Sequence, residues 1–199
     1  MVRKNGMFIV FEGLDGAGST TQATLLEINL KKIGYKTALT KEPTVGLMGG
    51  LIKAALAGEW KINPLALQLL FSADRAQHVE SQIIPALESG KIVISDRYFF
   101  SSVAYGAATG VDKDWLLAVN KNFKIPDITF FIDVSPKTSI KRIATGRFTA
   151  ELFEKEEALT KVREQYRKLA KQFGFKMING ERSIEDISKE IFEIVKKAL

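Results

Sequence analysis

Apolar and polar residues follow two alternating periods along this chain, and the pattern predicts five strands separated by helices. Short runs rich in β-branched and aromatic residues begin at about residues 7, 35, 91, 127 and 175. Between them apolar residues recur at helical spacing, notably over 19–30, 64–88, 154–173 and 183–199. We therefore predict an α/β fold with a five-stranded parallel sheet flanked by helices on both faces.

The pattern does not divide the chain, so we expect a single domain over residues 1–199. At this length one hydrophobic core can form without disulfides or structural metals. A short segment at about 143–152 lies between two helical patterns and carries Arg147, and it is predicted to be a mobile lid.

The amino-acid composition limits where the protein is expected to be located and which metals it could bind. No apolar run is long enough to cross a bilayer, and the basic N-terminus lacks a cleavage site for a signal peptide, so we expect a cytoplasmic protein with no membrane partner. The chain has no cysteine and one histidine, which excludes disulfides, thiolate zinc sites and a cysteine nucleophile. A metal would have to bind oxygen ligands, which favours Mg²⁺.

The formal net charge of +6 suits an anionic partner. The basic residues are scattered in pairs such as Lys31-Lys32 and Lys196-Lys197, and they do not form a run interleaved with aromatic residues. This distribution favours nucleotides as the anion and argues against nucleic acid.

A glycine-spaced turn joins the first strand to the first helix. Gly13-Leu14-Asp15-Gly16-Ala17-Gly18-Ser19-Thr20 follows the P-loop pattern G-x-x-x-x-G-K-[ST], except that Ser19 stands at the lysine position. Glycines let successive N–H groups surround a phosphate chain, and the helix N-terminus adds positive charge. Thr20 would supply the hydroxyl ligand for Mg²⁺. A glycine-rich turn without a ligand remains the alternative.

Polar residues also follow the second and third strands, at the edge where ligands bind in open α/β sheets. Asp96 can hold a Mg²⁺-bound water as a Walker B aspartate does, and Arg97 can clamp a phosphate. Lys41 is a further candidate for a phosphate contact. The alternatives are a helix cap at Asp96 paired with Arg97, and an exposed loop lysine at 41.

Two aromatic residues and one arginine are candidates for nucleoside contacts. Phe71 and Arg75 lie four residues apart on a predicted helix, so they share one face, where a ring and a guanidinium can bind a base. Tyr105 follows the third strand and could press against a sugar. Ordinary core packing of both rings, and a salt bridge from Arg75 to Asp74 or Glu80, remain open. His78 is expected to be structural.

These residues together resemble the thymidylate kinase family. The resemblance covers nearly the whole chain and rests on FEGLDGAG in the P-loop, KEP at 41–43, LLFSADRAQH at 69–78, DRY at 96–98, SSVAY at 101–105 and PDITFFIDV at 126–134. The block at 69–78 is the most specific, because P-loop residues are shared with other nucleoside monophosphate kinases. The family implies ATP-dependent phosphorylation of dTMP with Mg²⁺, and a homodimer.

Carried over by position, the resemblance implies individual roles. Phe71 would stack on thymine, Arg75 would bind its O4, Tyr105 would lie under the deoxyribose, and Asp15 would bind the 3′-hydroxyl. Arg97 and Lys41 would hold the acceptor phosphate, Lys41 replacing a more usual arginine. Catalysis would need cations and alignment and no general base, since a phosphate monoester is already largely ionised at neutral pH.

Two positions depart from the family pattern. Ser19 removes the P-loop lysine, and we predict that Arg147 or Arg142 replaces its charge, which makes Arg97, Arg142, Arg147 and Asp15 the expected catalytic set. Gly106 stands where many relatives have glutamine after the tyrosine. Two alternative functions remain. The protein could be a catalytically impaired nucleotide-binding sensor, with Ser19 as the cause, or a deoxynucleoside kinase with Glu12 as its base.

Overall fold

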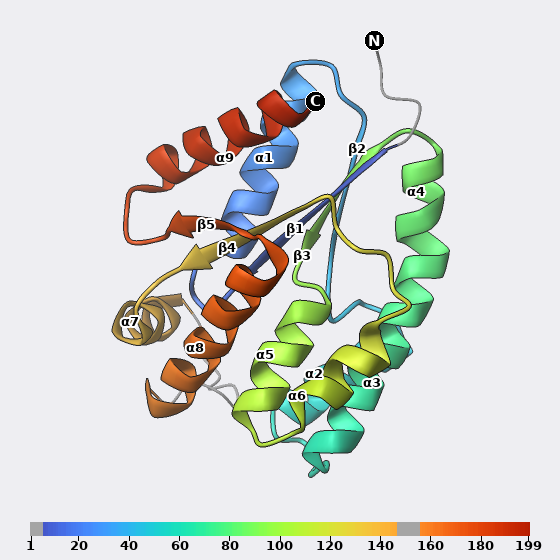
Figure 1. The fold of residues 1–199 in the computed structure, drawn as a ribbon, viewed down its shortest axis with the longest axis vertical. Helices are drawn as coiled ribbons and strands as arrows, with labels where there is room; N and C mark the ends of the chain where they lie inside the picture. The colour runs from blue at the N-terminus through green and yellow to red at the C-terminus, as the bar shows by residue number, and fades with distance from the viewer. Residues whose placement is uncertain (1–5, 147–155) are drawn as a thin grey trace.

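The computed structural model describes residues 6–146 and 156–199, which fold around one sheet. All five strands are parallel and lie in the order β2-β3-β1-β4-β5 (Figure 1). The predicted α/β class and the five-stranded parallel sheet are confirmed. The strands are β1 (Met7–Gly13), β2 (Thr37–Lys41), β3 (Ile92–Asp96), β4 (Ile128–Asp133) and β5 (Lys176–Asn179).

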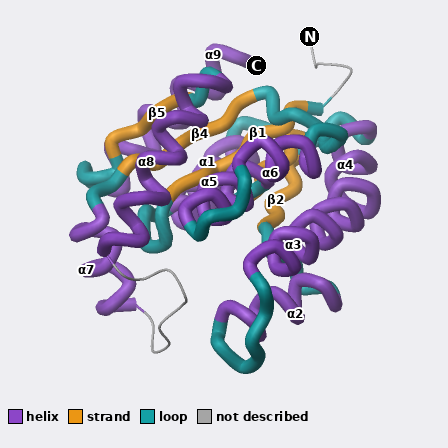
Figure 2. The backbone as a smooth tube through the Cα atoms, turned by 60° about the horizontal axis from the view of Figure 1, so that its bottom comes forward, coloured by secondary structure: helices purple, strands orange, loops and turns teal. Residues whose placement is uncertain are grey.

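The helices cover both faces of this sheet. Helices α1 and α9 pack together on one face, and α5 and α8 pack together on the other (Figures 1 and 2). The helical segments are α1 (Ser19–Lys32), α2 (Leu47–Leu56), α3 (Pro64–His78), η1 (Val79–Ile83), α4 (Ile84–Glu88), α5 (Phe99–Ala108), α6 (Lys113–Asn120), α7 (Pro136–Gly146), α8 (Glu156–Phe173) and α9 (Ile184–Ala198).

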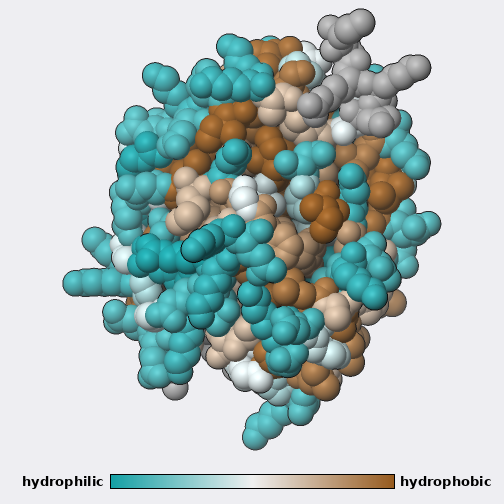
Figure 3. Space-filling view, in the orientation of Figure 1, coloured by the Kyte–Doolittle hydropathy of each residue, from teal (hydrophilic) through white to brown (hydrophobic). Residues whose placement is uncertain are grey.

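Burial explains why the central strands are the most apolar. Every residue of β1 and β3 is buried, because helices cover both of their faces, whereas the edge strands β2 and β5 are partly exposed. Figure 3 shows that hydrophobic residues on the outside gather in patches toward the middle of one face, while hydrophilic residues dominate its left edge. Strands β1 and β3 pair in parallel in this buried centre, so their carboxyl ends lie side by side. The P-loop follows one of these ends, and Asp96 lies at the other.

Three helical details differ from the sequence pattern. The helix predicted over 64–88 contains a π-helical segment, Val79–Ile83, two residues before Pro85. Proline has no N–H to donate, and the wider turn accommodates that missing bond. Helix α6 was not predicted, although Asp112 caps it by accepting from Trp115 N. The first residues of the predicted lid belong to α7, and 147–152 lie outside the described residues.

Candidate active site

The P-loop lies at the carboxyl end of β1 and forms one wall of a cavity of about 790 Å³. Gly16 and Gly18 have φ angles of 75° and 97°, in the left-handed region that favours glycine. At Gly16 a side chain would also collide, because a Cβ there would lie 2.8 Å from the Ser139 carbonyl oxygen. Helix α1 starts directly after Gly18, so its N-terminal N–H groups face the cavity as an anion site requires. All predicted P-loop residues except Gly13 line the cavity.

Thr20 and Asp96 meet at the base of this loop. The Thr20 hydroxyl donates to Asp96 Oδ2, and Asp96 Oδ1 is buried with no hydrogen-bond partner in the described part of the chain. Hard oxygen ligands with a spare buried carboxylate oxygen fit Mg²⁺, which usually takes one or two protein ligands besides phosphates and water. Within the described residues no group of three or more His, Cys, Asp or Glu could hold a metal ion.

Arg97 lies between the P-loop and the opposite wall. Its guanidinium donates to Asp15 Oδ1 at 2.6 Å and to the Gly13 carbonyl oxygen at 3.1 Å, and it lies over the Tyr105 ring. Tyr105 OH donates to Asp15 Oδ2 at 3.1 Å, so all three side chains form one cluster on the cavity wall. The φ of Arg97 is 72°, a strained conformation that is typical of functional sites. The acid that Arg97 pairs with is Asp15, and the alternative of an ion pair with Asp96 is wrong.

Burial and neighbouring charges determine the protonation states of Tyr105 and Arg97. Burial raises the pKa of the Tyr105 hydroxyl, and the Asp15 carboxylate raises it further, so Tyr105 acts as a neutral donor. Burial opposes the charge on Arg97, but Tyr105, Asp15 and Asp96 together raise its pKa well above the ordinary value. The guanidinium is therefore a fixed positive charge in the cavity.

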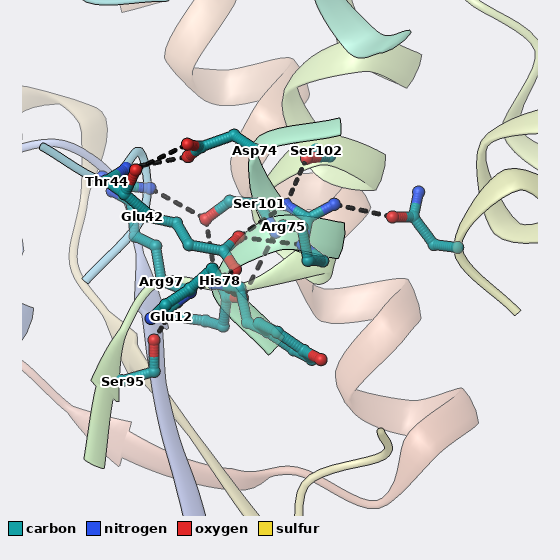
Figure 4. A network of polar contacts seen from close by, with 12 residues as sticks. Glu12, Glu42, Thr44, Asp74, Arg75, His78, Ser95, Arg97, Ser101 and Ser102 are labelled. Carbon is teal, nitrogen blue, oxygen red and sulfur yellow. Dashed lines mark hydrogen bonds and ion pairs between the residues drawn. The ribbon is translucent and has the colours of Figure 1, made fainter. Parts of the chain in front are cut away.

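Glu12 is fully buried directly before the P-loop. Its carboxylate accepts from Tyr98 N at 3.0 Å, Ser101 Oγ at 2.5 Å and Tyr166 OH at 3.0 Å, as Figure 4 shows in part. Burial raises its pKa to about 7 despite these donors and the nearby Arg97. Glu12 does not line the cavity, so it joins the P-loop to α5 and is poorly placed to take a proton from a substrate.

The opposite wall is made by α3 and α5, with Phe71 and Tyr105 lining the cavity as predicted. Lys41 is exposed at the end of β2 and also lines it. Several further residues that line the cavity were not predicted from the sequence, because their position depends on packing between distant segments. Among them are Lys53, Gln68, Ser102 and Arg182.

Arg75 is not part of the cavity wall. It is 1% exposed, pairs with Glu42 at 2.7 Å, and donates to Asn120 Oδ1 and Ser102 Oγ (Figure 4). The alternative partners Asp74 and Glu80 are wrong, because Asp74 instead accepts from Thr44 and Glu42 is the acid that Arg75 meets. Arg75 reaches the cavity only through two of its partners that line it, Glu42 and Ser102. His78 is buried against the same Glu42, in the structural role expected of it.

Positive charge also approaches the P-loop from α7. Arg142 lines the cavity and donates to the carbonyl oxygens of Ala17 at 3.3 Å and Gly180 at 2.9 Å. Arg142 therefore lies against the P-loop, in which Ser19 stands at the position of the usual lysine. Arg147 lies outside the described residues.

Comparison with known proteins agrees with this geometry. The family model "Thymidylate kinase" matches residues 11–191. A probable thymidylate kinase of Thermococcus gammatolerans is 46% identical, with 98% of each chain covered, and one of Pyrococcus horikoshii is 44% identical over 98% of each chain. A thymidylate kinase of Thermoanaerobacter sp. is 39% identical, covering 98% of this chain and 99% of its own. In the described part of the chain no helix is long and apolar enough to span a membrane. This chain belongs to the thymidylate kinase family.

Proposed function

We propose that this protein transfers the γ-phosphoryl group of ATP to dTMP and releases dTDP. One observation carries the proposal: a single cavity is lined by the P-loop, by the aromatic side chains of Phe71 and Tyr105, and by Arg97. Two nucleotides meeting head to head would place their phosphates at Arg97. The relatives that bear the family name support the choice of substrate.

The chain's own residues would align and neutralise the reacting groups. Thr20 and Asp96 would hold Mg²⁺, which supplies positive charge to the phosphates when bound. Arg97 would bind the acceptor phosphate together with Lys41, and Asp15 would accept a sugar hydroxyl, since each carboxylate oxygen has a second lone pair. A monoester dianion is already nucleophilic, so no side chain has to remove a proton.

The direct test is product analysis with ATP, Mg²⁺ and separate acceptors: dTMP, dUMP, dCMP and thymidine. We expect dTDP from dTMP and no product from thymidine. Complete absence of diphosphate with every donor and divalent ion would favour the nucleotide-binding sensor. Faster phosphorylation of thymidine than of dTMP would favour the deoxynucleoside kinase, but the enclosure of Glu12 argues against it.

We further propose that Arg142 supplies the charge that Ser19 lacks. The support is its position against Ala17 on the cavity wall. Arg142→Ala should lower turnover by ~10²-fold, the usual effect of removing a group that stabilises transition-state charge, and adding Ser19→Lys to that variant should restore part of it. Arg163→Ala is the matched control, because Arg163 pairs with Asp133 outside the cavity. Unchanged turnover in Arg142→Ala would transfer the role to Arg147.

The homodimer remains a proposal that rests on family membership. Light scattering coupled to gel filtration tests it, and a mass near twice 22.1 kDa is the expected result.

A further inference from the structure

Gln68 is a buried amide whose oxygen has no hydrogen-bond partner among the described residues. It lies on α3, three residues before Phe71, is 3% exposed, and lines the cavity. Leaving such an acceptor unsatisfied costs roughly 1–3 kcal/mol, so a buried amide of this kind needs an explanation.

The space that Gln68 fills is left open by Gly106 on α5. A Cβ built on Gly106 would lie 3.1 Å from Gln68 Cδ and 2.9 Å from Leu116 Cδ1. A side chain at 106 and the carboxamide of Gln68 therefore compete for the same volume. The glycine after Tyr105, which departs from the family pattern, places the amide of Gln68 against the face of α5 that carries Ser102 and Gly106.

Ser102 adds a polar group of defined direction to this part of the wall. Its Oγ accepts from Arg75 Nη2 at 2.9 Å, and Arg75 is held by Glu42 and Asn120. Because Ser102 Oγ accepts from Arg75, its O–H remains able to donate, and Ser102 lines the cavity. A ligand group that meets Ser102 should therefore be an acceptor, such as a carbonyl oxygen.

We propose that Gln68 reads the edge of the pyrimidine base, with Ser102 beside it; this rests on the proposed function. A carboxamide presents a donor and an acceptor side by side, which match a ring N–H and its neighbouring carbonyl oxygen in thymine or uracil. Phe71, three residues along the same helix, gives a ring against which that base can lie. The donor at Ser102 favours a carbonyl oxygen over the amino group of cytosine. Arg75 is then a positioning residue that acts through Ser102.

The test uses Gln68→Met, which keeps the length of the side chain and removes both hydrogen-bonding groups. With saturating Mg·ATP, kcat/KM is measured for dTMP and for N3-methyl-dTMP, which lacks the ring N–H. We expect the wild-type protein to prefer dTMP by about 10-fold or more, the equivalent of one or two hydrogen bonds. The preference should fall close to 1 in Gln68→Met, through a higher KM for dTMP.

Gln22→Met is the matched control. Gln22 is another buried glutamine that lines the cavity, and its Oε1 likewise has no partner among the described residues, but it lies on the P-loop side, where its Nε2 donates to the Ile184 carbonyl oxygen. This variant should keep the wild-type preference for dTMP over N3-methyl-dTMP. A fall in preference equal to that of Gln68→Met would overturn the assignment to Gln68.

A stability measurement separates base recognition from a structural role. Without nucleotide, Gln68→Met should unfold at the same temperature as the wild type or higher, because an unsatisfied buried amide has been removed. A clearly lower unfolding temperature together with an unchanged preference for dTMP would overturn the proposal. If the wild-type protein makes no dTDP at all, the proposed function fails instead, so the two failures are distinguishable.

Discussion

The P-loop wall of the cavity, residues 13–20, keeps its shape through backbone conformation, whereas the wall formed by α3 and α5 depends on buried side chains. In the P-loop, Gly16 and Gly18 adopt left-handed angles within one short segment. In the α3–α5 wall, Arg75 is held by Glu42 after β2, Ser102 on α5 and Asn120 on α6. One wall is local in sequence, and the other needs four distant segments.

This difference predicts different responses to mutation. Changes in the P-loop should impair phosphate binding and catalysis while the rest of the fold survives. Changes behind the α3–α5 wall should weaken the folded state first, because they leave charges buried without partners.

The largest loss of stability is expected when Glu42 is substituted, because Glu42 pairs with Arg75 and contacts His78. Glu42→Ala should lower the free energy of unfolding by roughly 3–5 kcal/mol, because the Arg75 charge stays buried without its partner. Denaturant unfolding measures this loss. Glu157→Ala, which removes an exposed pair with Lys161, should cause no measurable change. Equal effects in the two variants would contradict the account of the α3–α5 wall.

Glu12 lies directly before the P-loop and accepts hydrogen bonds from the start of α5. We expect it to make the stability of the folded protein depend on pH. Its pKa is about 7 in the folded state against an ordinary value of 4.5, so the folded protein holds this proton to a higher pH than the unfolded chain does. Stability contributed by protonated Glu12 should therefore decrease as pH rises from about 4.5 to 7, by on the order of 3 kcal/mol.

The measurement is the free energy of unfolding of the wild type and Glu12→Gln across this pH range. The difference between them should shift with pH in the stated direction. A constant difference would contradict the raised pKa of Glu12 in the folded state.

Substitution of Asp96 tests whether the P-loop side of the cavity carries the metal site needed for catalysis. Asp96→Asn should lower kcat by ~10²-fold, equivalent to about 2.7 kcal/mol, with a small change in stability. Asp133→Asn is the matched control, because Asp133 also ends a strand but pairs with Arg163 and Arg167. Steady-state rates at several Mg²⁺ concentrations measure both. Equal loss in the two variants would remove Asp96 from the metal site.

The smallest effect is expected at Gly18. A Cβ there meets no atom of the described residues within 4 Å, so Gly18→Ala should cost only the left-handed backbone conformation, about 1–2 kcal/mol. Gly16→Ala should cost more, because its Cβ also meets the Ser139 carbonyl oxygen. Thermal unfolding compares the two variants, and a larger loss at Gly18 would contradict this ranking.

The same contrast explains what could be predicted from the sequence. The strands, the P-loop and the Thr20–Asp96 pair depend on local patterns and on the rule that parallel strands end at one edge of the sheet. The short helix α6 was missed, although Asp112 before Trp115 and two leucines was a usable capping signal.

The partners of Arg75 could not be found in this way. Helical spacing placed it beside Phe71, but Glu42 and Asn120 lie 33 and 45 residues away and approach it only after β2 and α6 have packed. Likewise, nothing near Gln68 in sequence indicates that Gly106 leaves room for its side chain. Such contacts depend on tertiary packing, which periodicity does not encode.

The central claim is that one cavity holds both nucleotides with their phosphates facing each other. Calorimetric titration with a single compound that joins adenosine and thymidine through five phosphates tests it most directly. The account predicts one molecule bound per chain and loss of that binding when dTMP is present in excess. Unchanged binding of this compound in the presence of saturating dTMP would contradict it.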